Sequence, residues 1–359
     1  MSNYKFWYKV TVLTIAILVA LFAGALIILA VGGNVFETYW IIISMPFKNI
    51  RSLCEVFTRM IPLIIIALGI SVSSRSGINN IGAEGQMYMG VIASCAVALH
   101  CDGIPRIIAI PLCIICGALA GAAYGFIPGV LKAKLEVSEL LSTVMLNYAA
   151  TQFYVFCIRI PMLDPNEKTG TPMSARISQN ATLSKFIKGA SLHQGIILAA
   201  ILVVLIYILL FKTTWGYKMR AAGASQRAAR YGGINVPKYL IISMMISGAC
   251  AGMAGAVELM GVQGRAMEGI TSGYGFSGIV VALFGALHPI GIIPAAFFFG
   301  ILLYSQVNLQ ILTSVPPNLV STLQGLIILI IVAVQMVINN PYSQDHFRKR
   351  FFKRTIKEL

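Results

Sequence analysis

Polar side chains that could bind a solute or an ion gather in a few short segments between long apolar runs. The first segment, Ser74–Gly90, reads SRSGINNIGAEGQMYMG and lies between the apolar runs Ile61–Val72 and Met87–Leu99. A carboxylate such as Glu84 is costly when it faces lipid, and non-helical backbone at membrane depth needs protein or a water-filled cavity around it. The segment therefore predicts a hydrogen-bonding surface that lines a solute route or braces its wall, although an ordinary short cytoplasmic turn remains open.

Two further regions extend this polar surface. In the run Leu140–Ile158, Asn147 and its neighbours one helical turn away give one polar face, which could equally serve hydrogen bonding between helices. Gly261–Gly275 is a second glycine-rich polar interruption, and Glu258 precedes it. Aromatic faces beside amides suit a solute built from a base and a ribose, although interfacial belts also hold many tyrosines. The candidate pathway residues are Asn79, Asn80, Glu84, Gln86, Asn147, Tyr148, Gln152, Glu258, Tyr274 and Phe276.

The elements that must position these residues are membrane-spanning helices. The chain has 359 residues, of which 58% are hydrophobic and 11% charged, whereas soluble domains have about 25% charged residues. We expect an all-α polytopic membrane protein with helix packing through glycines, which recur at every fourth residue from Gly117 to Gly129 and again at Gly248 and Gly252. About ten spans are predicted: Val10–Val31, Leu53–Ser73, Met87–Leu99, Ile104–Pro128, Leu140–Ile158, Gly195–Phe211, Tyr239–Met260, Phe276–Leu287, Ile292–Leu309 and Val320–Ile338.

The charge distribution predicts how these spans are oriented. The formal net charge is +15, and the cations cluster in short loops and the C-terminal tail, which favours membrane orientation and anionic lipid over nucleic acid as the explanation. Both termini are expected in the cytoplasm. The predicted single transmembrane domain, 1–359, comprises a first helix (10–31), a first core half (53–160), an external loop (161–193), a cytoplasmic loop (213–237), a second core half (239–338) and a basic cytoplasmic tail (340–359).

The most basic internal segment is Thr213–Lys238, TTWGYKMRAAGASQRAARYGGINVPK. Its alanines favour a helix, Gly232-Gly233 predicts the end of that helix, and Pro237 predicts the start of the next span. A small alanine-lined helix with a basic rim fits the groove of a partner protein. A solvated loop that anchors the topology by its charge is the alternative.

Several kinds of chemistry are not indicated by the sequence. It has no G-x-x-x-x-G-K-[ST] segment, so the usual phosphate cradle for ATP is not predicted in this chain. The four histidines have no metal-ligand spacing, and the seven cysteines lie mostly in apolar runs. We therefore expect no catalytic residue, metal site or cofactor in this chain.

Four blocks in order resemble the permease subunits of bacterial ABC importers, in the group for nucleosides and simple sugars that is related to branched-chain amino acid permeases. They are GINNIGAEGQMYMG (77–90), LLSTVMLNYAA (140–150), GYKMRAAGASQRAARYGGIN (216–235) and the region from 252 to 291. The resemblance covers roughly residues 50–335. It implies a type II importer fold in the bacterial cytoplasmic membrane, with ATP used by separate cytoplasmic ABC ATPase subunits.

The resemblance also implies partners. These are a second permease, identical or different, and an external substrate-binding protein or lipoprotein, beside the membrane lipid. The loop 216–235 matches the coupling helix that docks on the ATPase. The coupling residues implied are Gly216, Arg220, Ala221, Gly223, Ala224, Arg227, Ala228, Arg230 and Gly233.

Two alternatives remain open at this stage. One is an ion-driven secondary carrier that uses Glu84 and Glu258 as ion sites, and the other is an ABC permease for branched-chain amino acids. We expect Glu84→Ala to lower transport while the complex still assembles. We expect Gly223→Glu to uncouple ATP hydrolysis from uptake more severely than Arg227→Ala, because a bulky charge in a packed centre costs more than a rim ion pair.

Overall fold

The computed structural model describes residues 3–30, 32–165, 170, 172–187 and 189–312, with the isolated positions 322, 325, 326 and 330. The chain divides into two compact units. The larger is Asn49–Gly300, and the smaller combines Met1–Lys48 with Ile301–Leu359. The predicted last span (320–338) falls almost entirely outside the described residues, and the predicted basic tail (340–359) falls wholly outside them.

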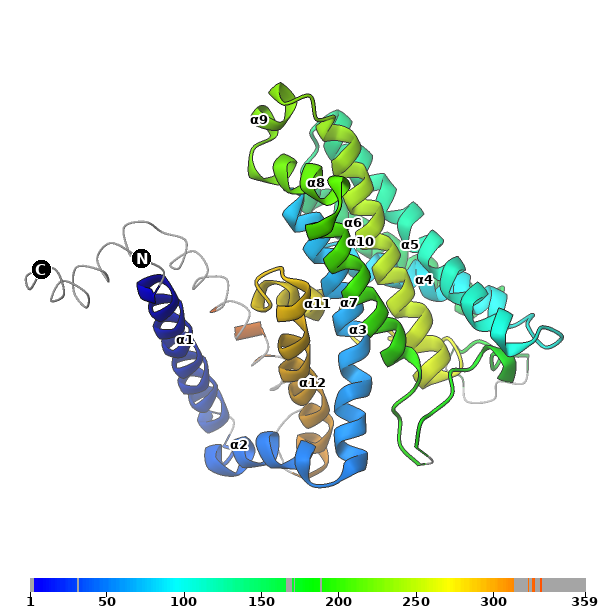
Figure 1. Cartoon of the computed structure of the whole chain (residues 1–359). Coiled ribbons are helices and arrows are strands. Elements are labelled where there is room, and N and C mark those ends of the chain that lie inside the picture. The colour runs from blue at the N-terminus through cyan, green and yellow to red at the C-terminus, as the bar shows by residue number, and fades with distance from the viewer. Residues whose placement is uncertain are drawn as a thin grey trace, which may run out of the picture. The chain divides into compact units, whose positions relative to one another are not determined.

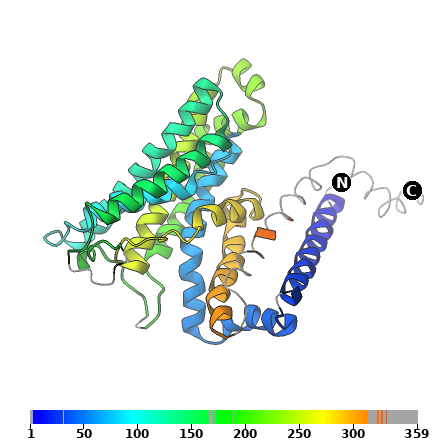
Figure 2. The same cartoon turned by 180° about the vertical axis from the view of Figure 1, so that it is seen from behind.

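The larger unit is a helical bundle (Figures 1 and 2). Helix α10 packs against α3, α4 and α5, and α3 also packs against α7 and α11. The helices of this unit are α3 (Ile50–Arg75), α4 (Ala83–Ala98), α5 (Arg106–Leu135), α6 (Glu139–Arg159), α7 (Gly195–Lys212), α8 (Thr214–Ala224), α9 (Gln226–Tyr231), α10 (Val236–Glu258) and α11 (Tyr274–Phe284), together with the first part of α12 (Pro289–Leu312). A 3-10 turn, η2 (Gln179–Ala181), and a π-helical end to α10, η3 (Leu259–Gln263), complete it.

Six described helices are long and apolar enough to cross a membrane. They are Ile50–Arg75, Arg106–Leu135, Glu139–Arg159, Gly195–Lys212, Val236–Gln263 and Pro289–Leu309. Two of the predicted spans are instead short helices, α4 with 16 residues and α11 with 11. A multi-pass helical membrane protein is therefore confirmed, whereas the count of ten spans and the side of each terminus stay predictions.

Glycines bring α5 and α10 into backbone contact, as their spacing predicted. A Cβ atom added at Gly121 would lie 2.1 Å from the carbonyl oxygen of Gly248, and one added at Gly252 would lie 2.1 Å from that of Gly117. Small residues allow this approach, and helix association inside a membrane relies on it because lipid offers no hydrophobic driving force. The two glycine series belong to one interface.

The smaller unit contains a helix that was not predicted. Between the predicted spans Val10–Val31 and Leu53–Ser73, α2 (Val35–Ser44) and the turn η1 (Met45–Phe47) follow α1 (Asn3–Ala30). Asn34 starts α2, because its side-chain oxygen accepts hydrogen bonds from the backbone N–H groups of Phe36 at 3.1 Å and Glu37 at 3.3 Å. A single Asn before an apolar run was the available signal for this short helix.

The two polar loops, 161–193 and 213–237, also contain short structural elements. Residues 161–193 hold η2 and isolated β-bridges, one of which joins Lys185 to His193. The basic loop forms two helices where one was expected, because Ser225 interrupts it and caps α9 through a hydrogen bond from Ala228 N at 3.3 Å. As predicted, Gly233 turns the chain with φ +76° and Pro237 lies in the first turn of α10.

Candidate functional site

The polar segment after α3 is a break between two helices, from Ser76 to Gly82. Asn80 is buried at its centre. Its amide nitrogen donates to Gln86 Oε1 at 2.7 Å and Ser247 Oγ at 2.8 Å, and its amide oxygen accepts from Gly82 N at 2.9 Å. Asn80 thus fixes the turn into α4 and ties it to α10.

Asn147 of α6 supports the same break from the other side. Its nitrogen donates to the carbonyl oxygen of Ile81 at 2.9 Å, and its oxygen accepts from Gly85 N at 2.8 Å. Buried backbone groups that lack a helical partner must be satisfied in this way. Asn147 replaces the hydrogen bonds that the interrupted helix cannot make.

Glu84, in the first turn of α4, links two short helices. Its carboxylate accepts hydrogen bonds from Thr271 Oγ1 at 2.5 Å and from Gly275 N at 2.7 Å. Gly275 is in the first turn of α11, so the carboxylate satisfies a free N–H there and complements the positive end of the helix dipole. Only 7% of Glu84 is exposed.

The contact between α4 and α11 requires glycine at position 275. A Cβ atom there would lie 2.4 Å from Glu84 N and 2.5 Å from Glu84 Oε2. Gly77 (φ +86°) and Gly273 (φ +73°) both adopt left-handed backbone ahead of a short helix. Two half-length helices therefore meet at Glu84.

The structure separates the candidate pathway residues into two groups. Asn80, Glu84, Gln86, Asn147, Glu258 and Tyr274 are buried, whereas Asn79, Tyr148, Gln152 and Phe276 are exposed on the larger unit. The hydrogen bonds of Asn80, Glu84, Gln86 and Asn147 hold the break together, which is the bracing role. The exposed group is free to contact a solute or a second subunit, and this role stays a prediction.

The helices α8 and α9 rest directly on this break. Ala222 of α8, Ala229 of α9 and Ile78 of the break share a small apolar core with Val236 and Leu240 of α10. The two glycines at the contact meet backbone to backbone, because a Cβ on Gly223 would lie 2.2 Å from the carbonyl oxygen of Arg75 and 2.9 Å from Gly77 N. A displacement of α8 must therefore move the start of the break.

This contact adds to one expectation about the basic loop. Gly223, expected at the centre of a face that fits a partner, is exposed, and it also packs against the backbone of Arg75 and Gly77. Its neighbour Ala222 is buried. The outward surface of the loop includes Gly223, Ala224, Arg227, Ala228, Arg230 and Tyr231, all exposed.

Arg75 connects the end of α3 to the turn between α11 and α12. Its Nε donates to the carbonyl oxygen of Leu287 at 2.6 Å, and its guanidinium lies 5.2 Å from the ring centroid of Phe211 in α7. Ala286 (φ +54°) and Leu287 (φ +55°) hold two successive left-handed conformations, each of which costs about 1–3 kcal/mol in a residue other than glycine. Sequence reasoning had no signal for this contact, which joins residues 212 positions apart.

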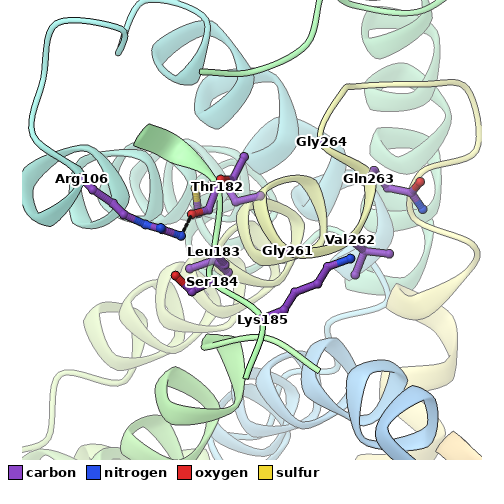
Figure 3. Close-up of a pocket in the computed structure, with 10 residues that line it drawn as sticks. Arg106, Thr182, Leu183, Ser184, Lys185, Gly261, Val262, Gln263 and Gly264 are labelled. Atoms are coloured by element: carbon purple, nitrogen blue, oxygen red, sulfur yellow. Dashed lines mark hydrogen bonds between the residues drawn. The ribbon is translucent and has the colours of Figure 1, made fainter. Parts of the chain in front are cut away.

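A pocket of about 480 Å³ lies beside the C-terminal end of α10 (Figure 3). It is formed by segment 182–185, segment 260–264 and Arg106, which donates a hydrogen bond to the carbonyl oxygen of Thr182. None of the candidate pathway residues lines it. Burial, with the positive charge of Lys185 nearby, lowers the pKa of the neighbouring His193 to about 4.

Comparison with known proteins adds a family. Residues 52–332 match the family model described as the permease component of branched-chain amino acid transport systems. No solved structure matches the chain.

Three curated relatives match over most of their length. The guanosine ABC transporter permease protein NupP of Bacillus subtilis is 37% identical over 89% of this chain and 92% of its own. The nucleoside ABC transporter permease protein NupB of Lactococcus lactis is 37% identical over 92% of both chains. The glucose ABC transporter permease protein TsgB13 of Haloferax volcanii is 31% identical over 90% of this chain and 87% of its own.

Proposed function

The chain belongs to the family of permease components of branched-chain amino acid transport systems, and we propose that it is the translocation subunit of an ATP-driven importer of nucleosides. The observation that carries the solute class is the 37% identity, over about nine tenths of both chains, to permeases named for guanosine and for nucleosides. The 31% identity to a glucose permease supports simple sugars as the second candidate.

The contacts of α8 support a route for coupling. An ATPase subunit that docks on the outward surface of α8 and α9 would press on the break through Gly223 and Ala222. The break leads into α4, and Glu84 joins α4 to α11. Docking would thereby reach both short helices through packed and hydrogen-bonded contacts, and Arg75 would carry the same displacement to the turn between α11 and α12.

The partners follow from this role. Two ATPase subunits would supply the energy, an external binding protein would deliver the solute, and a second permease would complete the route. Permease proteins of the same two bacterial species are also related to this chain, at 32% and 29% identity over 67% of it. This favours a pair of different permeases. We also propose that this chain is inserted in the bacterial cytoplasmic membrane with ten spans and both termini inside.

The test is reconstitution of the complete importer from this chain, its ATPase subunits, a second permease and the binding protein. We expect uptake of labelled guanosine that requires ATP, with other nucleosides competing and with leucine having no effect. Competition by glucose alone would replace the nucleoside assignment with a sugar. Uptake driven by an ion gradient without ATPase subunits would overturn the importer proposal itself.

A further inference from the structure

Two arginines meet at the junction of α7 and α8, where the larger unit passes from a membrane-spanning helix to the basic loop (Figure 1). We call Arg75 and Arg220 the α7–α8 basic cluster. The guanidinium carbons of Arg75 and Arg220 each lie 5.2 Å from the ring centroid of Phe211, the penultimate residue of α7. Cations over an aromatic face gain electrostatic attraction, but they also bring like charges together.

The cluster has no counter-charge within the described part of the chain. The ion pairs found there join Lys132 to Glu139 and Arg159 to Glu268 and include no member of the cluster. Arg220 Nε is buried and has no hydrogen-bond partner among the described residues. A buried donor without a partner costs about 1–3 kcal/mol, and Arg220 as a whole is only partly buried. An anion beside its guanidinium would offset the repulsion between the two arginines.

The surroundings of the cluster indicate which anion binds. Trp215, in the first turn of α8, is 48% exposed, and Tyr217 is 63% exposed. Tryptophan and tyrosine favour the headgroup level of a bilayer, and the cytoplasmic leaflet carries anionic lipid. Arg220 turns back onto Phe211 of the spanning helix, whereas Arg227 belongs to the outward surface. This orientation favours a lipid over an acidic side chain of a docked partner.

We propose that the α7–α8 basic cluster binds the phosphate of an anionic phospholipid headgroup, with Arg220 as its main ligand. The site rests on the membrane-spanning fold and on the cytoplasmic side assigned to α8, and not on the identity of the solute. A lipid held there would occupy the joint between the spanning helix α7 and the helix that contacts the break. Lipid composition would then affect how firmly α8 is held.

Trp215 serves as the reporter in the test. The full-length chain with Trp7→Phe and Trp40→Phe keeps Trp215 alone, and it is reconstituted in phosphatidylcholine vesicles containing brominated phosphatidylglycerol or brominated phosphatidylcholine. We expect the anionic lipid to quench Trp215 at a several-fold lower mole fraction than the zwitterionic lipid. Arg220→Gln should reduce this preference about five-fold, which corresponds to about 1 kcal/mol per basic residue near an anionic surface.

Two variants keep the result interpretable. Arg220→Lys retains the charge and should retain most of the preference, which separates charge loss from misfolding. Lys134→Gln, at an exposed position in α5, removes the same charge elsewhere and should leave the preference unchanged.

Equal quenching by the two brominated lipids would overturn the proposal, as would an unchanged preference in Arg220→Gln. If millimolar inorganic phosphate abolished the preference for phosphatidylglycerol, the cluster would be a site for free phosphate instead of a lipid site. If Arg220→Gln changed only the co-purification of ATPase subunits, the cluster would belong to the protein interface. Failure of guanosine uptake in the complete importer would leave all these lipid results unaffected.

Discussion

Removing the Glu84 carboxylate tests whether this residue braces two short helices or carries an ion. In Glu84→Ala, Thr271 Oγ1–H and Gly275 N–H lose their acceptor in a buried place. Each hydrogen bond to a charged group contributes about 1.5–3 kcal/mol, and part of that is offset because the buried carboxylate no longer has to be desolvated. We expect Glu84→Ala to lower the free energy of unfolding by about 2–6 kcal/mol, a large part of the 5–15 kcal/mol typical of a domain.

Graded substitutions divide this effect. Thr271→Val removes one donor and should cost about 1–2 kcal/mol, because the bond to Gly275 survives. Glu84→Gln keeps one acceptor oxygen and should lie between Thr271→Val and Glu84→Ala. Glu268→Ala is the matched control, since Glu268 is exposed and its ion pair with Arg159 measures 3.8 Å. The measurement is thermal unfolding of the purified chain in detergent, with hydrogen exchange localised to α4 and α11.

Uptake in the complete importer distinguishes the two roles. If Glu84 is a brace, Glu84→Gln should retain most of the uptake at a temperature where the variant is folded. An unfolding midpoint for Glu84→Ala equal to that of Glu268→Ala would refute the bracing argument. A Glu84→Gln variant of normal stability with no uptake would show that the ionised carboxylate acts in transport.

Three further predictions concern other regions. Gly223→Glu should destabilise the packing of α8 on Arg75 by at least the roughly 1–3 kcal/mol of an overpacked site and should abolish coupled ATPase activity. Arg227→Ala should weaken docking of the ATPase by about 1 kcal/mol or less. Wild-type coupling in Gly223→Glu would contradict this prediction. The pKa of His193 is about 4 when folded and about 6.5 when unfolded, so the unfolded state binds more protons and the chain should lose about 3 kcal/mol of stability as the pH falls from 6.5 to 4; His193→Asn should melt with less dependence on pH, and equal dependence in both proteins would refute the assignment. A single cysteine at Ser225 should react with an impermeant maleimide only after the cells are opened. Labelling in intact cells would show that this loop lies on the external side of the membrane.

The sequence by itself determined the class of protein and the place of the breaks. Long apolar runs with few charges predict a multi-pass helical membrane protein, because a bilayer cannot hydrogen-bond exposed backbone N–H and C=O groups. The predicted interruption, Ser74–Gly90, includes the break at Ser76–Gly82, but from Ala83 onward it is already part of α4. The alanines of the basic loop predicted a helix there, but as one helix, and the structure divides it at Ser225, which caps α9.

Only the tertiary structure decided what the polar residues do. Glu84 meets Thr271 and Gly275 across a separation of nearly two hundred positions, and the pairing of distant polar groups leaves no periodic signal in one sequence. The same limit applies to Gly223. Its small size was compatible with a surface that fits a partner's groove, but only the structure shows that its backbone lies against Arg75. Apolar periodicity reports that a face is buried, whereas the neighbour that buries it is chosen by how the helices pack.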